Sequence, residues 1–169
     1  MLPTTKGYEK VTLDTETQDG MSAVAAECLR RIITAGGLDA EVSIGTPDAS
    51  DILLEITGAD AGSLVGQHGH TLDALQYIVM LIINKKRETR IRITIDAAGY
   101  RARRVLTLSK FANQLADEVV SSGQEALTDP LNPMERRIIH TALAERGDVS
   151  TYSEGEEPNR YMVITPKTS

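Results

Sequence analysis

The sequence is poor in cysteine, in aromatic residues and in long apolar runs. Its 169 residues include one cysteine, no tryptophan and only 4% aromatic residues. A single cysteine cannot form an internal disulfide, and no Cys/His spacing resembles a zinc site, which excludes a disulfide scaffold and a zinc finger. The longest apolar run covers residues 77–83, whereas a membrane-spanning helix needs about 20 residues. The N-terminus also lacks the apolar core of a secretory signal. We therefore expect a cytoplasmic protein with no membrane span, no metal and no cofactor.

Acidic residues dominate the composition, yet the middle of the chain is basic. The net charge is −6 and the sequence pI about 5.1, which argues against a nucleic-acid ligand because such binding depends on Lys and Arg. Residues 61–110 nevertheless hold 9 basic and 3 acidic side chains, whereas residues 1–60 and 111–169 carry balances of −7 and −5. This asymmetry indicates that the middle region meets an anion, with a solvated charged face as the alternative.

Apolar spacing predicts the elements of the first half of the chain. Residues 1–18 show no periodicity, and a helix-type stripe then runs from Met21 until Gly36-Gly37 stops it. Alternating residues predict strands at 41–44, 51–57 and 90–96. Between the last two strands we expect a short helical turn, a glycine loop and a helix that Thr71 caps. The main apolar face of that helix is predicted to consist of Leu72, Leu75, Val79 and Ile82.

The second half is predicted to contain two helices and a hairpin. Gly99 opens a long helix to about Ser122, followed by a short strand at 124–128. Asn132-Pro133-Met134-Glu135 has the residues of a capping box, and that helix is expected to run to about Arg146. Residues 148–153 and 160–165 are typical of a hairpin. The seam of the long helix is predicted to be Val105, Leu108, Ala112, Leu115 and Val119.

The first candidate site is the loop Gly66-Gln67-His68-Gly69. Its two glycines let another chain approach the backbone, and the N-terminus of the following helix offers N–H groups to an anion. The order helix–strand–strand–helix–GxxG–helix–strand resembles a type II KH domain, in which this loop clamps about four backbone nucleotides. KH loops usually carry Lys or Arg between the glycines. Because Gln67 and His68 carry no fixed charge, Arg90 or Arg92 would have to supply it. An ordinary tight turn is the alternative.

The second candidate site is Arg136 with His140, which lie one turn apart on one helix face and could hold one phosphate together. Two solvated polar residues beside a core face are the alternative. The stretch 134–140, with residues 153–156 and 160–164, resembles the arginine-three-histidine domain of single-stranded nucleic-acid binders, and it adds Arg160 to the candidates. Arg101 and Arg104 share one side of the long helix and are also candidates, unless their stems only pack over apolar neighbours or pair with Asp96.

Residues 96–104 and, most specifically, Thr71-Leu72-Asp73-Ala74-Leu75-Gln76-Tyr77 resemble one family, the bacterial Jag (SpoIIIJ-associated) proteins. The resemblance covers roughly residues 20–166. It implies an α+β fold with a type II-like KH domain (19–97) and a small α/β arginine-three-histidine domain (98–169). The lack of periodicity predicts a mobile arm at residues 1–18 before them. Many members carry an additional N-terminal domain, for which we expect no room in this chain. The family is cytoplasmic, binds RNA and is linked to cell-envelope processes, sometimes beside a smaller KH partner.

We predict a non-catalytic binder of single-stranded RNA that acts as a post-transcriptional regulator. Single-stranded DNA is a second ligand to consider, and a small KH-domain protein and a homodimer are the partners left open. The alternative function is a protein-interaction scaffold with weakened nucleic-acid binding, which the Gln67-His68 pair and the acidic total favour. An enzyme with His140 as base and Glu135 or Asp96 assisting is not expected, because no nucleophile–base–orienter set is evident.

Overall fold

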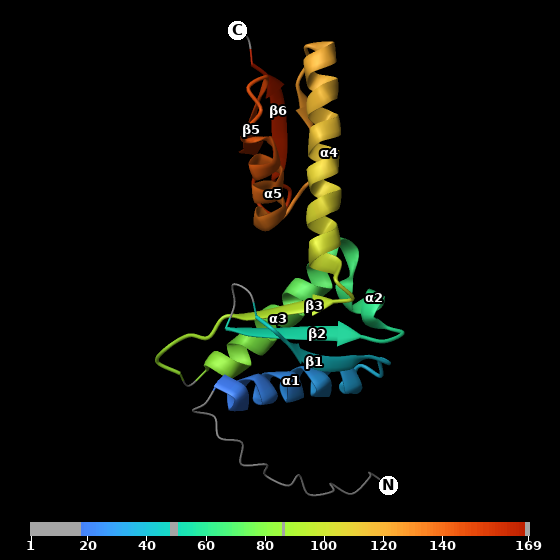
Figure 1. Ribbon diagram of the computed structural model, residues 1–169, viewed down its shortest axis with the longest axis vertical. Helices are drawn as coiled ribbons and strands as arrows, with labels where there is room; N and C mark the ends of the chain where they lie inside the picture. Colours follow the sequence, from blue (N-terminus) through green and yellow to red (C-terminus); the bar gives the residue numbers. More distant parts are fainter. Residues whose placement is uncertain (1–17, 48–50, 86, 168–169) are drawn as a thin grey trace, which may run out of the picture. The chain divides into compact units, whose positions relative to one another are not determined.

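A three-stranded sheet with helices on one face forms the first part of the protein (Figure 1). The computed structural model describes residues 18–47, 51–85 and 87–167, which divide into two compact units between Tyr100 and Arg101. The first unit contains α1 (Gln18–Ala35), β1 (Glu41–Gly45), β2 (Ile52–Thr57), α2 (Ala61–Val65), a 3-10 turn (Gln67–Gly69), α3 (His70–Asn84) and β3 (Ile93–Ala97). The predicted arm at residues 1–18 lies outside the described residues except for Gln18, where α1 begins.

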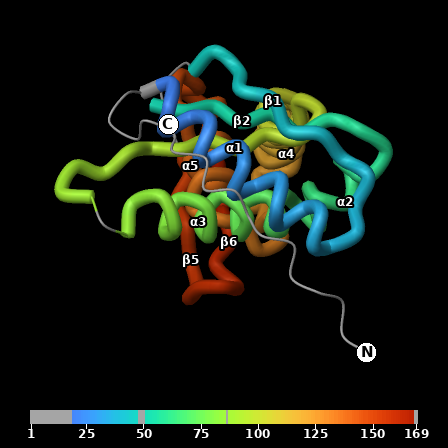
Figure 2. The backbone as a smooth tube through the Cα atoms, turned by 90° about the horizontal axis from the view of Figure 1, so that it is seen from below, coloured from blue at the N-terminus to red at the C-terminus, as the bar shows by residue number. Residues whose placement is uncertain are grey.

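Strand β2 is the centre of this sheet. It pairs antiparallel with β1 and parallel with β3, so that Leu54 aligns with Ile95 and their side chains share one face. Helices α1 and α3 pack against each other and against this face, and Figure 2 shows them side by side. Leu29 and Leu72 are completely buried there. A parallel pair needs a crossover connection, and α2, the 3-10 turn and α3 supply it. The predicted order of elements is therefore the observed one.

The second unit packs two helices on an antiparallel sheet. It contains α4 (Tyr100–Ser122), β4 (Ala126–Leu127), α5 (Pro133–Leu143), β5 (Val149–Glu154) and β6 (Tyr161–Pro166), with strand order β4-β6-β5. The buried stripe of α4 meets Ile139 of α5 and Ile164 of β6 in one core. The predicted capping box is confirmed: the Asn132 side chain accepts from the Glu135 N–H, and the Glu135 carboxylate accepts from the Asn132 N–H. Among the described helices, none has the length and hydropathy of a membrane span.

Several predicted details are wrong for identifiable reasons. Thr71 does not cap α3, because Gly69 occupies the cap position and Thr71 lies inside the helix. Strand β3 begins only at Ile93. Before it, the N–H and carbonyl of Ile91 bond to the Asn84 side chain and the Arg92 N–H donates to the Asp51 carboxylate, although the Arg92 carbonyl already accepts from the backbone of Asp51 and Ile52.

Two helical faces are also rotated from the prediction. On α3, Ile83 is buried and Ile82 is exposed, because a spacing of 3, 4 and 4 from Leu72 follows the helix period to Ile83. On α4, Val105 is exposed and Ala116 belongs to the seam. Helix α5 ends at Leu143, where the Ala144 N–H turns back to Thr141 and Arg146 pairs with Asp148.

Candidate nucleic-acid interface

The GxxG loop is a tight turn whose two ends have backbone conformations that favour glycine. Gly66 has φ 68° and ψ −172°, a region that is essentially restricted to glycine, and Gly69 has φ 83°. His68 between them adopts φ 52°, which histidine tolerates better than most side chains. Three of the four residues thus have a left-handed φ, and the chain reverses directly into α3.

Both glycines are also required by contacts within the first unit. A Cβ on Gly66 would collide with the Thr71 Oγ1 atom, and a Cβ on Gly69 would lie 2.8 Å from Tyr100 Cε1. Tyr100 is itself packed against the core of this unit. The glycines therefore have a structural role that is independent of any ligand.

The tip of the loop faces solvent at the start of α3. Gln67 and His68 are both exposed, whereas Gly69 is buried. The His68 ring lies 6.5 Å from the ring of His70, in an edge-to-face arrangement. Because α3 begins at His70, the first N–H groups of a 15-residue helix and its positive dipole end lie directly after the tip.

Arg90 and Arg92 lie at the other end of β3 from this loop. They precede Ile93, whereas Tyr100, which packs on Gly69, follows Ala97. Five strand residues span about 13 Å between their first and last Cα atoms. Arg92 in addition forms an ion pair with Asp51 at 3.6 Å, and Arg90 is exposed. The structure therefore does not bring these two arginines to the loop, contrary to the expectation that one of them supplies its charge.

Arg104 binds a buried carboxylate of its own unit. Its Nε and Nη2 atoms lie 2.8 and 2.7 Å from Glu135 Oε1, and the Glu135 side chain is 5% exposed. The same carboxylate closes the capping box of α5 through its other oxygen. Arg104 thus ties α4 to α5, and its pairing with Glu135 is a role that the sequence did not reveal. Arg101, one turn earlier on α4, is half-buried.

Arg136 and His140 are each anchored by a partner. Arg136 donates to the Leu131 carbonyl and to Glu157 Oε1, and its side chain is only 12% exposed. His140 is exposed, and its Nδ1 atom lies 2.7 Å from Thr151 Oγ1, which orients the ring on β5. The helix brings the two residues to one side of α5, but the guanidinium already holds a carboxylate.

Arg160 completes a small charged cluster with these residues. Its guanidinium binds Ser153 Oγ, at 3.0 Å from Nε and 2.9 Å from Nη2, which fixes it on the hairpin. The hydrogen bond from Arg136, aided by the positive charges of Arg136 and Arg160, lowers the pKa of Glu157. Arg136 therefore binds the Glu157 carboxylate directly, whereas Arg160 acts on it only through its charge. Sequence reasoning misses Glu157 because nothing in its acidic loop indicates Arg136 as its partner.

One carboxylate considered as a partner of His140 is already engaged. Glu135 is held by Arg104 and by its own cap, so it does not assist His140. Within the described ranges, no group of three or more His, Cys, Asp or Glu side chains could hold a metal ion. Burial raises the pKa of the Cys28 thiol, which packs against the core of the first unit.

Comparisons with known proteins identify the type of each unit. Residues 23–95 match the family described as KhpA/KhpB, KH domain, and residues 106–166 match the arginine-three-histidine domain family. Proteins named "RNA-binding protein KhpB" are similar over most of the chain. The one from Clostridium symbiosum is 34% identical over 162 residues, which is 95% of this chain and 73% of that protein.

Two further relatives with the same name are longer than the match. The protein of Bacillus subtilis (strain 168) is 39% identical over 114 residues, 66% of this chain and 55% of its own length. That of Streptococcus pneumoniae serotype 2 (strain D39 / NCTC 7466) is 32% identical over 92% of this chain and 48% of its own length. The α+β fold with a KH-type unit followed by an arginine-three-histidine unit is thereby confirmed, and the chain belongs to the KhpB (Jag) family.

Proposed function

We propose that this protein is a non-catalytic binder of single-stranded RNA. The observation that carries the proposal is the exposed Gln67-His68 tip, which lies directly before the N-terminus of α3. Backbone N–H groups at such a position bind phosphate without any charged side chain. The choice of RNA follows the relatives, which are named RNA-binding proteins.

The arginine-three-histidine unit provides the second contact in this proposal. His140 and the guanidinium groups of Arg136 and Arg160 hold a phosphate, which takes the place of the Glu157 carboxylate. Charge-assisted hydrogen bonds from guanidinium to phosphate are strong, so the exchange of one anion for another is feasible. Arg101 and Arg104, and Arg90 and Arg92 on the KH unit, have the weaker role of attracting the RNA over longer range.

The KH contact is tested at the loop tip, because the two glycines are needed for the fold. We expect the double variant Gln67→Asp/His68→Asp to bind fluorescein-labelled oligouridine at least about tenfold more weakly, since two carboxylates would face the phosphates. Aspartate is among the residues that tolerate the left-handed φ of position 68. Fluorescence anisotropy at fixed salt measures the change.

The matched control is Thr34→Asp/Thr46→Asp, which adds the same charge at exposed positions of the same unit. Equal weakening by the two double variants would mean that only net charge matters. The loop would then have no specific part in binding.

The regulatory and envelope-linked role that the family resemblance implies is also part of this proposal. Crosslinking followed by sequencing of the bound RNA tests it.

The alternative function, a protein-interaction scaffold, is favoured by one specific feature of α3. Tyr77, Ile78, Leu81 and Ile82 are 45–58% exposed and lie on the side of the helix away from the core. Apolar residues in such a stripe are typical of a contact surface. We propose that it docks a second copy of this KH unit, with a small KH-domain protein as the other candidate.

Light scattering on the full chain tests this interface. The wild-type protein should have the mass of a dimer, and Leu81→Asp/Ile82→Asp should have that of a monomer with unchanged helicity. If the wild type is a monomer, self-association is wrong. If the variant also loses oligouridine binding, the helix face contributes to the RNA site instead.

A further inference from the structure

The sheet of the arginine-three-histidine unit has an outer face that its own helices do not use. Met162 and Ile164 of β6 belong to the core with α4 and α5, so the alternate residues of β6 point to the opposite side. In register, Leu127 of β4 and Tyr152 of β5 both align with Val163. Tyr161 aligns with Glu154 on the same side. We call the set Leu127, Tyr152, Tyr161 and Val163 the tyrosine face.

The tyrosine face is apolar and partly open. Leu127 is 56% exposed and Tyr152 is 49% exposed, whereas Val163 between them is only 1% exposed. In this row across three strands, Leu127 and Tyr152 flank the buried Val163 on either side. Two of the five tyrosines of the chain are gathered here, although aromatic residues make up only 4% of the sequence.

Carboxylates surround this face. Glu125 directly precedes β4 and Glu154 ends β5. The pKa of Tyr152 is raised mainly by burial. The negative charges of Glu125 and Glu154, and then the nearby Tyr161, raise it further. Glu154 is two residues from Tyr152 on β5 and so lies on the same side of the sheet, and the negative charge of Glu125 also acts on Tyr152. Two arginines of this unit are engaged elsewhere, Arg160 with Ser153 and Arg136 of α5 with Glu157.

These charges decide between two classes of ligand. Tyrosines on a sheet face are a common platform for stacked bases, but the phosphates attached to those bases would meet the two carboxylates. A guanidinium or ammonium group gains from both features, since it is attracted to a tyrosine ring and to a carboxylate beside it. The surface is therefore complementary to a cationic ligand that also offers apolar contact.

We propose that the tyrosine face docks an arginine-bearing segment of another protein, with a guanidinium held over Tyr152 between Glu125 and Glu154. The aliphatic stem of that arginine, or an apolar neighbour, rests on Leu127 and Val163. The arginine-three-histidine unit would then bind two ligands of opposite charge, an anion at Arg136 and His140 and a basic protein segment on the outer face of its sheet.

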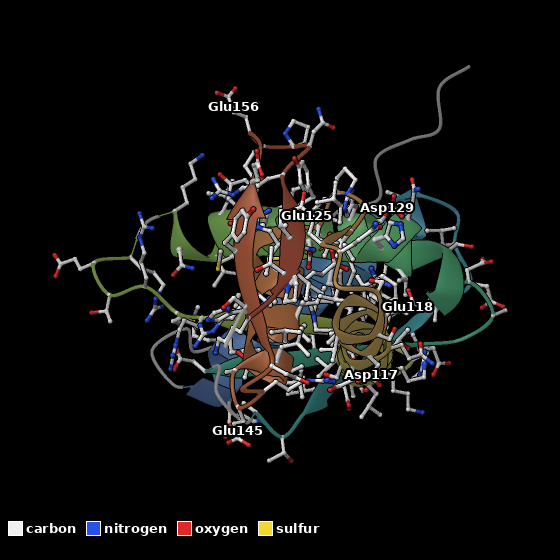
Figure 3. The ribbon with its side chains drawn as sticks, turned by 90° about the horizontal axis from the view of Figure 1, so that it is seen from above. Asp117, Glu118, Glu125, Asp129, Glu145 and Glu156 are labelled. Carbon is white, nitrogen blue, oxygen red and sulfur yellow. The ribbon has the colours of Figure 1, made fainter. Side chains whose placement is uncertain are left out.

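The test measures binding of a fluorescein-labelled oligo-arginine peptide to the 169-residue chain at physiological salt. Glu125→Gln/Glu154→Gln should weaken binding about tenfold or more. The matched control is Glu118→Gln/Glu145→Gln, which removes the same charge from exposed positions of the same unit that lie apart from Glu125 in Figure 3. Tyr152→Phe should retain the affinity because the ring remains, and Tyr152→Ala should lose it.

Three results would overturn the proposal: no binding of the peptide to the wild type, equal weakening by both double variants, or an unchanged affinity of Tyr152→Ala. A parallel titration with labelled oligouridine separates the other class of ligand. If Tyr152→Ala weakens binding of oligouridine but not of the peptide, the face stacks bases and the proposal is wrong. The charge variants lie at exposed positions, so the test does not depend on the folding of Tyr152→Ala.

Discussion

In the proposed contact between RNA and the arginine-three-histidine unit, Glu157 competes with the phosphate for Arg136. Its carboxylate occupies Arg136, so a phosphate must displace it. We expect Glu157→Gln to bind oligouridine about three- to tenfold more tightly, and the plot of log affinity against log salt to steepen by about 0.7, the value of one added phosphate contact. Anisotropy titrations over a salt series measure both quantities.

Glu156→Gln is the control for that change. It removes the same charge from the adjacent, exposed residue without releasing Arg136. Should both variants tighten binding equally, the gain would come from overall charge, and Arg136 would be excluded as a phosphate ligand.

Gly66 in the GxxG loop and Gly62 in α2 differ in how well they tolerate substitution by alanine. Gly66→Ala should destabilise the protein by about 1–3 kcal/mol, because alanine is strained at φ 68°, ψ −172° and its Cβ would collide with Thr71. Gly62→Ala, in α2 with no atom near its Cβ, should be neutral or stabilising by up to about 1 kcal/mol. Urea unfolding compares them, and similar values for both would contradict the strained loop.

At the scale of elements, local patterns predict the type of an element better than its rotation. The capping box around Asn132 and Glu135 is predictable because all of its partners lie within four residues. The prediction for the buried face of α3 is wrong at its end, since Ile82 and Ile83 are equally apolar and only the contact with the sheet selects one. The start of β3 escapes prediction because Asn84 and Asp51 bond to its approach from distant positions.

The connection between α4 and α5 is expected to depend on Glu135. Glu135→Gln should lower the free energy of unfolding by about 2–4 kcal/mol, because the half-buried Arg104 would lose its charged partner and the capping box would weaken. Glu118→Gln, at an exposed position of α4, should change it by less than about 0.5 kcal/mol. Denaturant unfolding monitored by circular dichroism makes the comparison, and a loss no larger than that of the control would show that the pair is not stabilising.

At the scale of the whole molecule, the acidic total leaves few cations for RNA. With about 3–5 phosphate contacts, log affinity for oligouridine should fall with log salt at a slope of roughly −2 to −4. Titrations of the wild type at several salt concentrations give this slope. Binding that does not change with salt would contradict backbone recognition at either site.

The sequence alone determined the order of the elements, the division of the chain into a KH-type and an arginine-three-histidine half, and the two candidate sites. These depend on spacings of a few residues, which act along one helix or one turn. The tertiary structure alone decided which arginines are engaged, since Arg104 meets Glu135 and Arg136 meets Glu157 across 31 and 21 residues of chain. It also separated Arg90 and Arg92 from the GxxG loop and gathered two tyrosines on one sheet face. Such pairings follow from strand register and helix packing, which the local periodicity of the sequence does not predict.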